Sequence, residues 1–343
     1  MKMNIRFKFV LREVSMQSKS FIEIHARDFR ARGLGALFGL CVLVMLSSGA
    51  GCQHRASVVP PAPRAERLIT IGGAVTEIVF ALGHGDEVVG VDTSSVFPPQ
   101  AKLLPQVGYQ RTLAAEGVLA LRPTRLLAAE EAGPPAALAQ LRSAGLAVEI
   151  IPSPSTLDGC RQKIEKLAAL LGKRERGAQL IARLNEEVAQ ARTQPTDPRQ
   201  RVLFLYTRGA GTLLIAGSET SADSMIQLAG AQNAAAAVRG HKPLAAEALL
   251  GMRPDVLLLT SRSLESFGGV QAIYQLPGLA ALPTQQRPRI ITQDDLLLLG
   301  FGPRTGQAIR ELRAKLDQTV GEVQPATQAP ATAQPVMAAA GPK

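Results

Sequence analysis

A segment that occurs twice limits the possible folds of this chain more than any other feature. Residues 113–129 read LAAEGVLALRPTRLLAA and align without a gap with residues 244–260, LAAEALLGMRPDVLLLT. The matched positions include an acidic residue near the start, Glu116 and Glu247, and an Arg-Pro pair just past the middle. Each copy predicts a short helix, a break at proline and a buried strand. A reused helix-to-strand module would explain such a match, but we favour two similar lobes that each contain one copy.

Strands and helices alternate on both sides of a long helical stretch. Before it, strand patterns such as RLITIGG and EVVGVD alternate with helical patterns such as AVTEIVFALG, and after it RVLFLYT opens a second series. Short apolar strands separated by helices are typical of α/β folds with parallel sheets. We therefore predict an N-terminal lobe over 66–156, one long linking helix over 157–193 and a C-terminal lobe over 200–320.

The beginning of the chain has the layout of an export signal. An apolar run from Leu34 to Leu46 follows a basic stretch and precedes the small residues before Cys52. This order is typical of a signal peptide, so we predict one over 1–52 and a periplasmic protein. The small residues before Cys52 also resemble a bacterial lipobox, which leaves lipid attachment at Cys52 and a soluble product both open.

Two stretches rich in Pro and Ala lie outside the predicted lobes. Residues 53–65 read QHRASVVPPAPRA, which predicts a flexible tether. Residues 322–343 have a similar low-complexity composition, and we predict a disordered tail there.

The composition argues against nucleic-acid binding and against catalysis. Residues 1–51 carry eight Lys or Arg and three Asp or Glu, so +5 of the net charge of +10 lies in the signal segment. No dense basic run with interleaved aromatic residues occurs. The chain has no Gly-x-Ser-x-Gly, His-Glu-x-x-His or Walker motif. We therefore predict a protein that binds a compact ligand between two lobes, with a secreted α/β enzyme as the alternative from another class.

Four stretches resemble the hemin-binding proteins that feed bacterial ABC importers. They are RLITIGGAVTEIVFALGHGDEVVGVDTSSVFP, LPQVGYQRTLAAEGVLALRP, KPLAAEALLGMRPD and DDLLLLGFGPRT, and the similarity spans residues 67–316. The resemblance implies the class III periplasmic-binding-protein fold, in which a helix joins two lobes. It also implies that the chain captures haem in the cleft between the lobes and delivers it to a membrane permease. A siderophore or cobalamin carrier on the same scaffold is the alternative.

The resemblance implies a ligand for the haem iron. The family's loop tyrosine coordinates the iron, and here that residue is Tyr109. A phenolate is a hard anionic ligand suited to ferric iron, and Arg111 would supply a hydrogen bond or positive charge to it. Some relatives place a second-lobe histidine where this chain has Arg208, which could instead pair with a haem propionate. Weaker candidates for such a contact are Arg239, Lys242 and Arg304.

The resemblance also implies partners. In this class one surface glutamate on each lobe docks onto basic residues of the permease, and Glu116 and Glu247 occupy equivalent positions in the repeat. The expected partners are haem as a transported ligand, a permease dimer with its cytoplasmic ATPase, and an outer-membrane haem receptor upstream. No nucleic-acid partner is expected.

Overall fold

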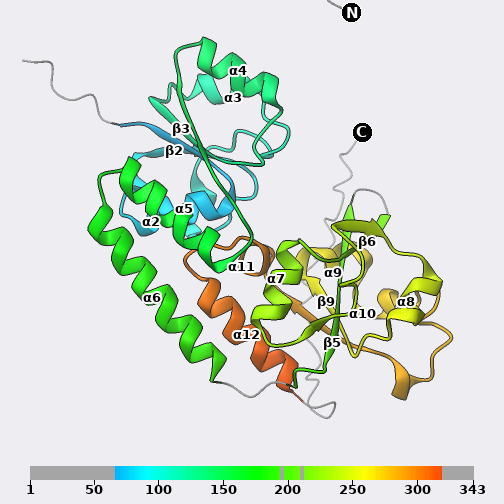
Figure 1. Cartoon of the computed structure of the whole chain (residues 1–343). Helices are drawn as coiled ribbons and strands as arrows, with labels where there is room; N and C mark the ends of the chain where they lie inside the picture. The colour runs from blue at the N-terminus through cyan, green and yellow to red at the C-terminus, as the bar shows by residue number, and fades with distance from the viewer. Residues whose placement is uncertain (1–65, 194–196, 209–211, 319–343) are drawn as a thin grey trace, which may run out of the picture. The chain divides into compact units, whose positions relative to one another are not determined.

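The computed structural model describes residues 66–193, 197–208 and 212–318. All of them lie in one compact unit that spans Pro63–Lys343 (Figure 1). The predicted signal peptide, Cys52, the predicted tether and the predicted tail lie outside the described residues. None of the described helices is both long and apolar enough to cross a membrane.

The first sheet contains four parallel strands in the order β2-β1-β3-β4. The strands are β1 (Leu68–Ile71), β2 (Val88–Val91), β3 (Arg125–Ala129) and β4 (Ala147–Ile151). Its helices are α2 (Gly73–Ala81), α3 (Ala115–Ala120) and α4 (Pro135–Ser143), with 3-10 turns η1 (Gly85–Glu87) and η2 (Pro99–Leu103). Strand β1 is buried along its whole length, because α3 and α4 cover one face of the sheet and α2 covers the other (Figure 1). This burial explains the continuous apolar runs in the sequence.

The second sheet is mixed, with the order β10-β9-β5-β6-β8 and β7 beside β5. Its strands are β5 (Arg201–Arg208), β6 (Thr212–Ala216), β7 (Gln232–Asn233), β8 (His241–Pro243), β9 (Val256–Thr260) and β10 (Arg289–Gln293). Strands β5, β7, β9 and β10 are parallel, whereas β6 and β8 form antiparallel pairs. Its helices are α7 (Ser221–Leu228), α8 (Ala246–Met252), α9 (Ser261–Phe267), α10 (Val270–Tyr274), α11 (Asp295–Leu299) and α12 (Thr305–Asp317), with a 3-10 turn η3 (Thr284–Gln286). The predicted α/β fold with two sheets is confirmed.

Two helices, rather than the single one predicted, connect the sheets. Helix α5 (Leu157–Leu170) begins at Thr156, whose side chain accepts a hydrogen bond from the Gly159 amide, and helix α6 (Arg174–Arg192) follows it. The break has a local cause, since Gly172 has φ +66°, a left-handed conformation that ends a helix and favours glycine. Helix α6 packs along both α5 and α12.

One hydrophobic cluster is continuous through the connecting helices. It joins Val79 of α2, Ile164 of α5 and Leu184 of α6 to Phe204 of β5 and Leu312 of α12, all of them buried. Smaller clusters line the far face of each sheet. The two sheets therefore share part of their core instead of being joined by a bare linker.

Both copies of the repeat fold alike. In each, a short helix ends at an arginine in the left-handed conformation, Arg122 with φ +48° and Arg253 with φ +41°, and a proline and a buried strand follow. A left-handed conformation costs a residue with a Cβ roughly 1–2 kcal/mol. The predicted internal repeat is thus present down to its backbone geometry.

Candidate functional site

Tyr109 lies on a loop that the first sheet holds in place. After β2, the Thr93 amide donates to the Gly108 carbonyl at 3.0 Å, and the Gly133 amide donates to the Gln110 carbonyl at 2.9 Å. Gly108 has φ +100°, which lets the chain turn directly before the tyrosine. The Tyr109 side chain is 45% exposed, although the backbone on both sides of it is tied down. An aromatic side chain that is exposed on a fixed loop is available to a ligand.

Arg111 is exposed two residues further on. Within the described residues, no hydrogen bond joins its guanidinium to Tyr109, so any contact between these two side chains would form with a ligand present. Both residues belong to the same turn, in which the Thr112 amide donates to the Tyr109 carbonyl at 2.9 Å.

The second sheet carries a cavity of about 360 Å³. Its lining residues are Tyr206, Thr260, Arg262, Ser263, Ser266, Asp295 and Leu299. Thr260 ends β9, and Arg262 and Asp295 lie in the first turns of α9 and α11. The cavity is therefore at the carboxyl ends of parallel strands, where open α/β sheets bind their ligands.

None of the residues that line this cavity was predicted from the sequence as a site residue, and Arg262 and Tyr206 are the two that bear on ligand binding. Arg262 follows the buried strand of the second repeat copy, and its amide donates to an Asp295 carboxylate oxygen at 3.3 Å. Tyr206 stacks near Phe204, with 6.3 Å between ring centroids. The sequence did contain a signal that could have identified Tyr206, because Tyr206 and Arg208 have the same Tyr-x-Arg spacing as Tyr109 and Arg111.

The remaining predicted candidates have different surroundings. Arg208 is the last residue of β5 and pairs with Thr212 of β6, and its side chain lies outside the described part. Arg239 is exposed, and its Nε donates to Glu219 Oε2 at 2.7 Å. Lys242 is exposed on β8.

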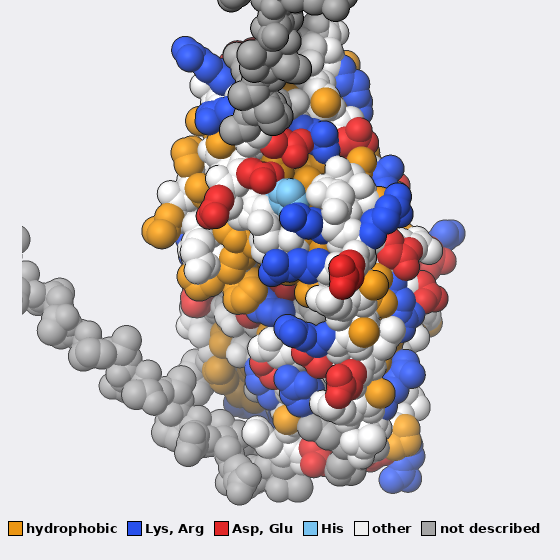
Figure 2. All heavy atoms as spheres, turned by 90° about the vertical axis from the view of Figure 1, so that its left-hand side faces the viewer, with side chains coloured by type: hydrophobic (Ala, Val, Ile, Leu, Met, Phe, Trp, Pro, Cys, Tyr) orange, Lys and Arg blue, Asp and Glu red, His pale blue; other side chains and the backbone are white. Residues whose placement is uncertain are grey.

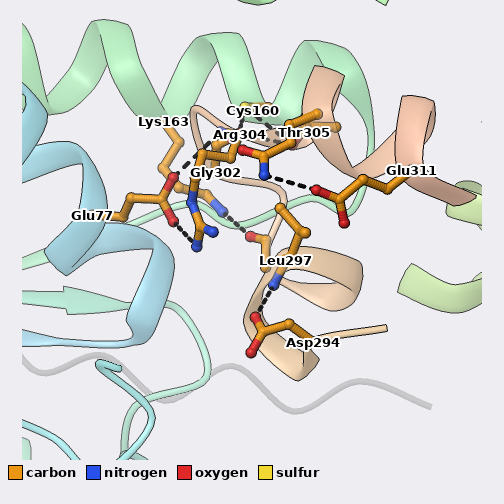
Figure 3. A network of polar contacts seen from close by, with 11 residues as sticks. Glu77, Cys160, Lys163, Asp294, Leu297, Gly302, Arg304, Thr305 and Glu311 are labelled. Carbon is orange, nitrogen blue, oxygen red and sulfur yellow. Dashed lines mark hydrogen bonds and ion pairs between the residues drawn. The ribbon is translucent and has the colours of Figure 1, made fainter. Parts of the chain in front are cut away.

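Arg304 joins residues that are far apart in the sequence (Figure 3). Its Nη2 donates to Glu77 Oε2 at 2.9 Å, and its amide donates to Glu77 Oε1 at 3.3 Å. Its guanidinium carbon lies 3.5 Å from the centre of the Phe97 ring, within the range of a cation–π contact. Burial raises the pKa of Glu77, and the hydrogen bond and charge of Arg304 oppose that rise. The Arg304 side chain is therefore engaged within the protein.

Helix α5 contributes two buried side chains to the region around Arg304. Lys163 Nζ donates to the carbonyls of Gly300 and Phe301 at 3.3 and 3.4 Å, and the Cys160 thiol donates to the Gly302 carbonyl at 3.1 Å. Burial lowers the pKa of Lys163 and raises that of Cys160 to about 11. Together these contacts fix the turn that precedes α12.

A larger cavity of about 700 Å³ lies against α5, α6 and α7. Asp158, Arg161, Asn185 and Arg192 are among its lining residues, and Arg161 is already paired with Asp158 and Asn185. None of the predicted ligand-binding residues lines either cavity, but of the two it is the smaller one that lies at the carboxyl ends of parallel strands. We therefore give the smaller cavity more weight as a ligand site.

The two predicted docking glutamates begin equivalent helices. Glu116 is exposed in the first turn of α3, and its carboxylate accepts a hydrogen bond from Gln140 at 3.3 Å. Glu247 occupies the same position in α8. Over the part of the surface near α6, basic and acidic side chains are interspersed instead of forming a patch of one sign (Figure 2). Within the described residues, no group of His, Cys, Asp and Glu could hold a free metal ion.

Two solved structures share the fold at substantial identity. The periplasmic heme-binding protein RhuT from Roseiflexus sp. RS-1, in its apo form, is 46% identical with a TM-score of 0.70, over 74% of this chain and 98% of that one. The periplasmic heme-binding protein BhuT, solved with two hemes, is 41% identical with a TM-score of 0.69, over 73% of this chain and 97% of that one.

Curated relatives are more distant in sequence. An ABC transporter substrate-binding lipoprotein, YvrC from Bacillus subtilis, is 26% identical over 72% of this chain and 78% of its own length. A vitamin B12-binding protein from Yersinia pestis is 27% identical over 58% of this chain and 71% of its own length.

The model of the periplasmic binding protein family matches residues 68–296, which include both sheets and the connecting helices. Its members bind ligands for transport and are not enzymes, which confirms the prediction of a binding protein. The resemblance inferred from the sequence is confirmed as well: this chain belongs to the periplasmic binding protein family.

Proposed function

We propose that this protein captures haem outside the cytoplasm and delivers it to the permease of an ABC importer. The observation that carries the proposal is the exposed Tyr109 on its fixed loop, in a chain 46% identical to a heme-binding protein. Haem is the transported ligand and has no catalytic role. The expected compartment is the periplasm, reached through the signal peptide over 1–52, with a lipid anchor at Cys52 as a further proposal supported by the lipoprotein relative.

In this proposal Tyr109 ligates the iron as phenolate. A free phenol titrates near 10, so the charge of the ferric ion and the neighbouring Arg111 would stabilise the deprotonated form. The haem propionates carry negative charge, and the candidates for pairing with them are Arg262 in the second-sheet cavity and Arg208 at the end of β5. Arg239 and Lys242 are exposed and stay weaker candidates. The Glu77 pair and the Phe97 contact support a structural role for Arg304.

The test is a hemin titration followed by absorption spectroscopy. The wild-type protein should give an intense Soret band with the charge-transfer features of tyrosine-ligated ferric haem. Tyr109→Phe keeps the ring and removes the oxygen, so those features should vanish. Tyr274→Phe is the matched control, because the Tyr274 hydroxyl donates to the Pro288 carbonyl and Tyr274 lies outside the Tyr109 loop and the second-sheet cavity. A wild-type protein that binds no hemin, or a Tyr109→Phe variant with an unchanged spectrum, would contradict the proposal.

A cobalamin or siderophore carrier is the second candidate, and the vitamin B12-binding relative is the observation in its favour. Parallel titrations with cyanocobalamin and ferric siderophores separate the candidates. If the protein binds cyanocobalamin or a ferric siderophore tightly and hemin weakly, that compound and not haem is the ligand.

The proposed partners are a permease dimer with its ATPase, and an outer-membrane haem receptor upstream. We propose Glu116 and Glu247 as the docking residues, since they occupy the same position in the two repeat copies.

A further inference from the structure

The helices that carry Glu116 and Glu247 end in the same uncommon way. Arg122 and Arg253, at equivalent positions of the repeat, have φ values of +48° and +41°. Glycine is the usual residue in this conformation after a helix. Each arginine also precedes a proline, which normally pushes the residue before it towards extended backbone. Both copies thus keep a strained residue with a long cationic side chain at a position where glycine would adopt the same backbone conformation without strain.

The side chains of two other arginines, Arg67 and Arg201, hold these turns by donating to backbone carbonyls. In the first copy the Arg67 guanidinium donates to the carbonyls of Leu121 and Arg122, at 2.8 and 3.0 Å. In the second copy Arg201 donates to the Met252 carbonyl at 2.9 and 3.1 Å.

The strand starts are fixed in the same manner in both copies. The Arg67 amide donates to Thr124 Oγ1 at 2.9 Å, and the Arg201 amide donates to Asp255 Oδ2 at 2.7 Å. Thr124 and Asp255 are themselves equivalent positions of the repeat. The geometry of each turn is therefore fully provided without the guanidinium of Arg122 or Arg253.

With respect to the residues that the structure describes, those two guanidinium groups are available to an external partner. Both residues are exposed, and in the described part of the chain neither side chain takes part in a hydrogen bond or an ion pair. Strain that is retained at an exposed, repeated position and serves no internal contact points to a function outside the fold.

We propose that Arg122 and Arg253 form a second matched pair of contacts to the permease, each with an acidic side chain. This inference rests on the proposed docking role of Glu116 and Glu247. In each copy the arginine follows the glutamate by six residues and lies just beyond the short helix that the glutamate begins. Each half of a two-fold partner would then present one basic and one acidic group at that spacing. Alternating charges of this kind fix the orientation of docking more than they raise affinity.

The test compares a double variant, Arg122→Gly with Arg253→Gly, with wild type for binding to the permease complex in nanodiscs. Glycine relieves the strain, so the melting temperature should rise by roughly 2–4 °C. Permease affinity should nevertheless fall about tenfold at low salt, and less at high salt because the lost contacts are screened. Arg→Lys at both positions should retain most of the affinity. The matched control for charge is Arg174→Ala with Arg183→Ala, two exposed cations on α6 outside the repeat.

Comparison with Glu116→Gln and Glu247→Gln separates the two proposals. If the glutamine variants lose affinity and the glycine variant does not, Arg122 and Arg253 make no contact and this inference is wrong while the docking proposal stands. If neither set loses affinity, the docking proposal fails and this inference fails with it. A loss in the glycine variant together with a raised melting temperature supports direct contact, since a loss of structure would lower that temperature.

Discussion

The buried side chain of Cys160 makes the stability of the fold depend on pH. Its thiol, on α5, is fully buried and donates to the Gly302 carbonyl, and burial raises its pKa from 9.0 to about 11. The folded protein thus keeps a proton that the unfolded chain loses between these two values. The stabilisation is complete below pH 9 and is lost as the pH rises through about 11.

We therefore expect the stability difference between wild type and Cys160→Ala to shrink from pH 8 to pH 10.5. A shift of this size corresponds to about 2–3 kcal/mol in full. The lowered pKa of the neighbouring Lys163 makes the folded protein more stable, relative to the unfolded chain, as the pH rises. This opposes the effect of Cys160, so the stability difference between wild type and Cys160→Ala is informative and the wild-type curve alone is not. Urea unfolding at several pH values measures it. Parallel curves for the two proteins would contradict the expectation, as would ready alkylation of Cys160 in the folded protein at pH 8.

At the scale of elements, the pair between Glu77 and Arg304 ties α2 to the start of α12. Glu77 is 5% exposed and Arg304 is 21% exposed, so removing the carboxylate leaves a largely buried cation unpaired. Glu77→Gln should lower the free energy of unfolding by about 2–4 kcal/mol, somewhat less than for a fully buried pair. Glu219→Gln breaks an exposed pair with Arg239 and should cost at most about 1 kcal/mol. Chemical unfolding of both variants provides the comparison, and equal losses would show that the pair between Glu77 and Arg304 stabilises the protein no more than an exposed pair does.

The elements also show how far the sequence could predict the structure. Hydrophobic periodicity and the repeat were sufficient to predict two α/β halves and the equivalence of α3 and α8, because both signals are local in the sequence. The break between α5 and α6 depends on the conformation of Gly172, which the helical pattern on either side conceals. The partner of Arg304 could not be predicted, since Glu77 is 227 residues away and the GFGPRT motif says nothing of what the arginine contacts. Tyr109 was identified through family resemblance, and its rarity in the chain would not have been sufficient.

At the scale of the whole molecule, the shared core bears on how the protein would engage a transporter. The largest hydrophobic cluster extends from α2 through α5 and α6 to β5 and α12. Two docking points on such a body are coupled, because contact at one raises the effective concentration of the other. The equivalence of Glu116 and Glu247 further implies that a two-fold symmetric permease would meet each of them in the same way.

We therefore expect Glu116→Gln and Glu247→Gln to weaken permease binding by similar factors, roughly five- to tenfold each at low salt, and the double variant by about the product. Hemin spectra should stay unchanged in all three, since neither glutamate belongs to the Tyr109 loop or lines the second-sheet cavity. Titration of labelled protein with the permease complex in nanodiscs measures the binding. A large loss in one single variant beside none in the other would mean that one lobe alone carries the contact, and the repeat would then reflect shared folding and not shared docking.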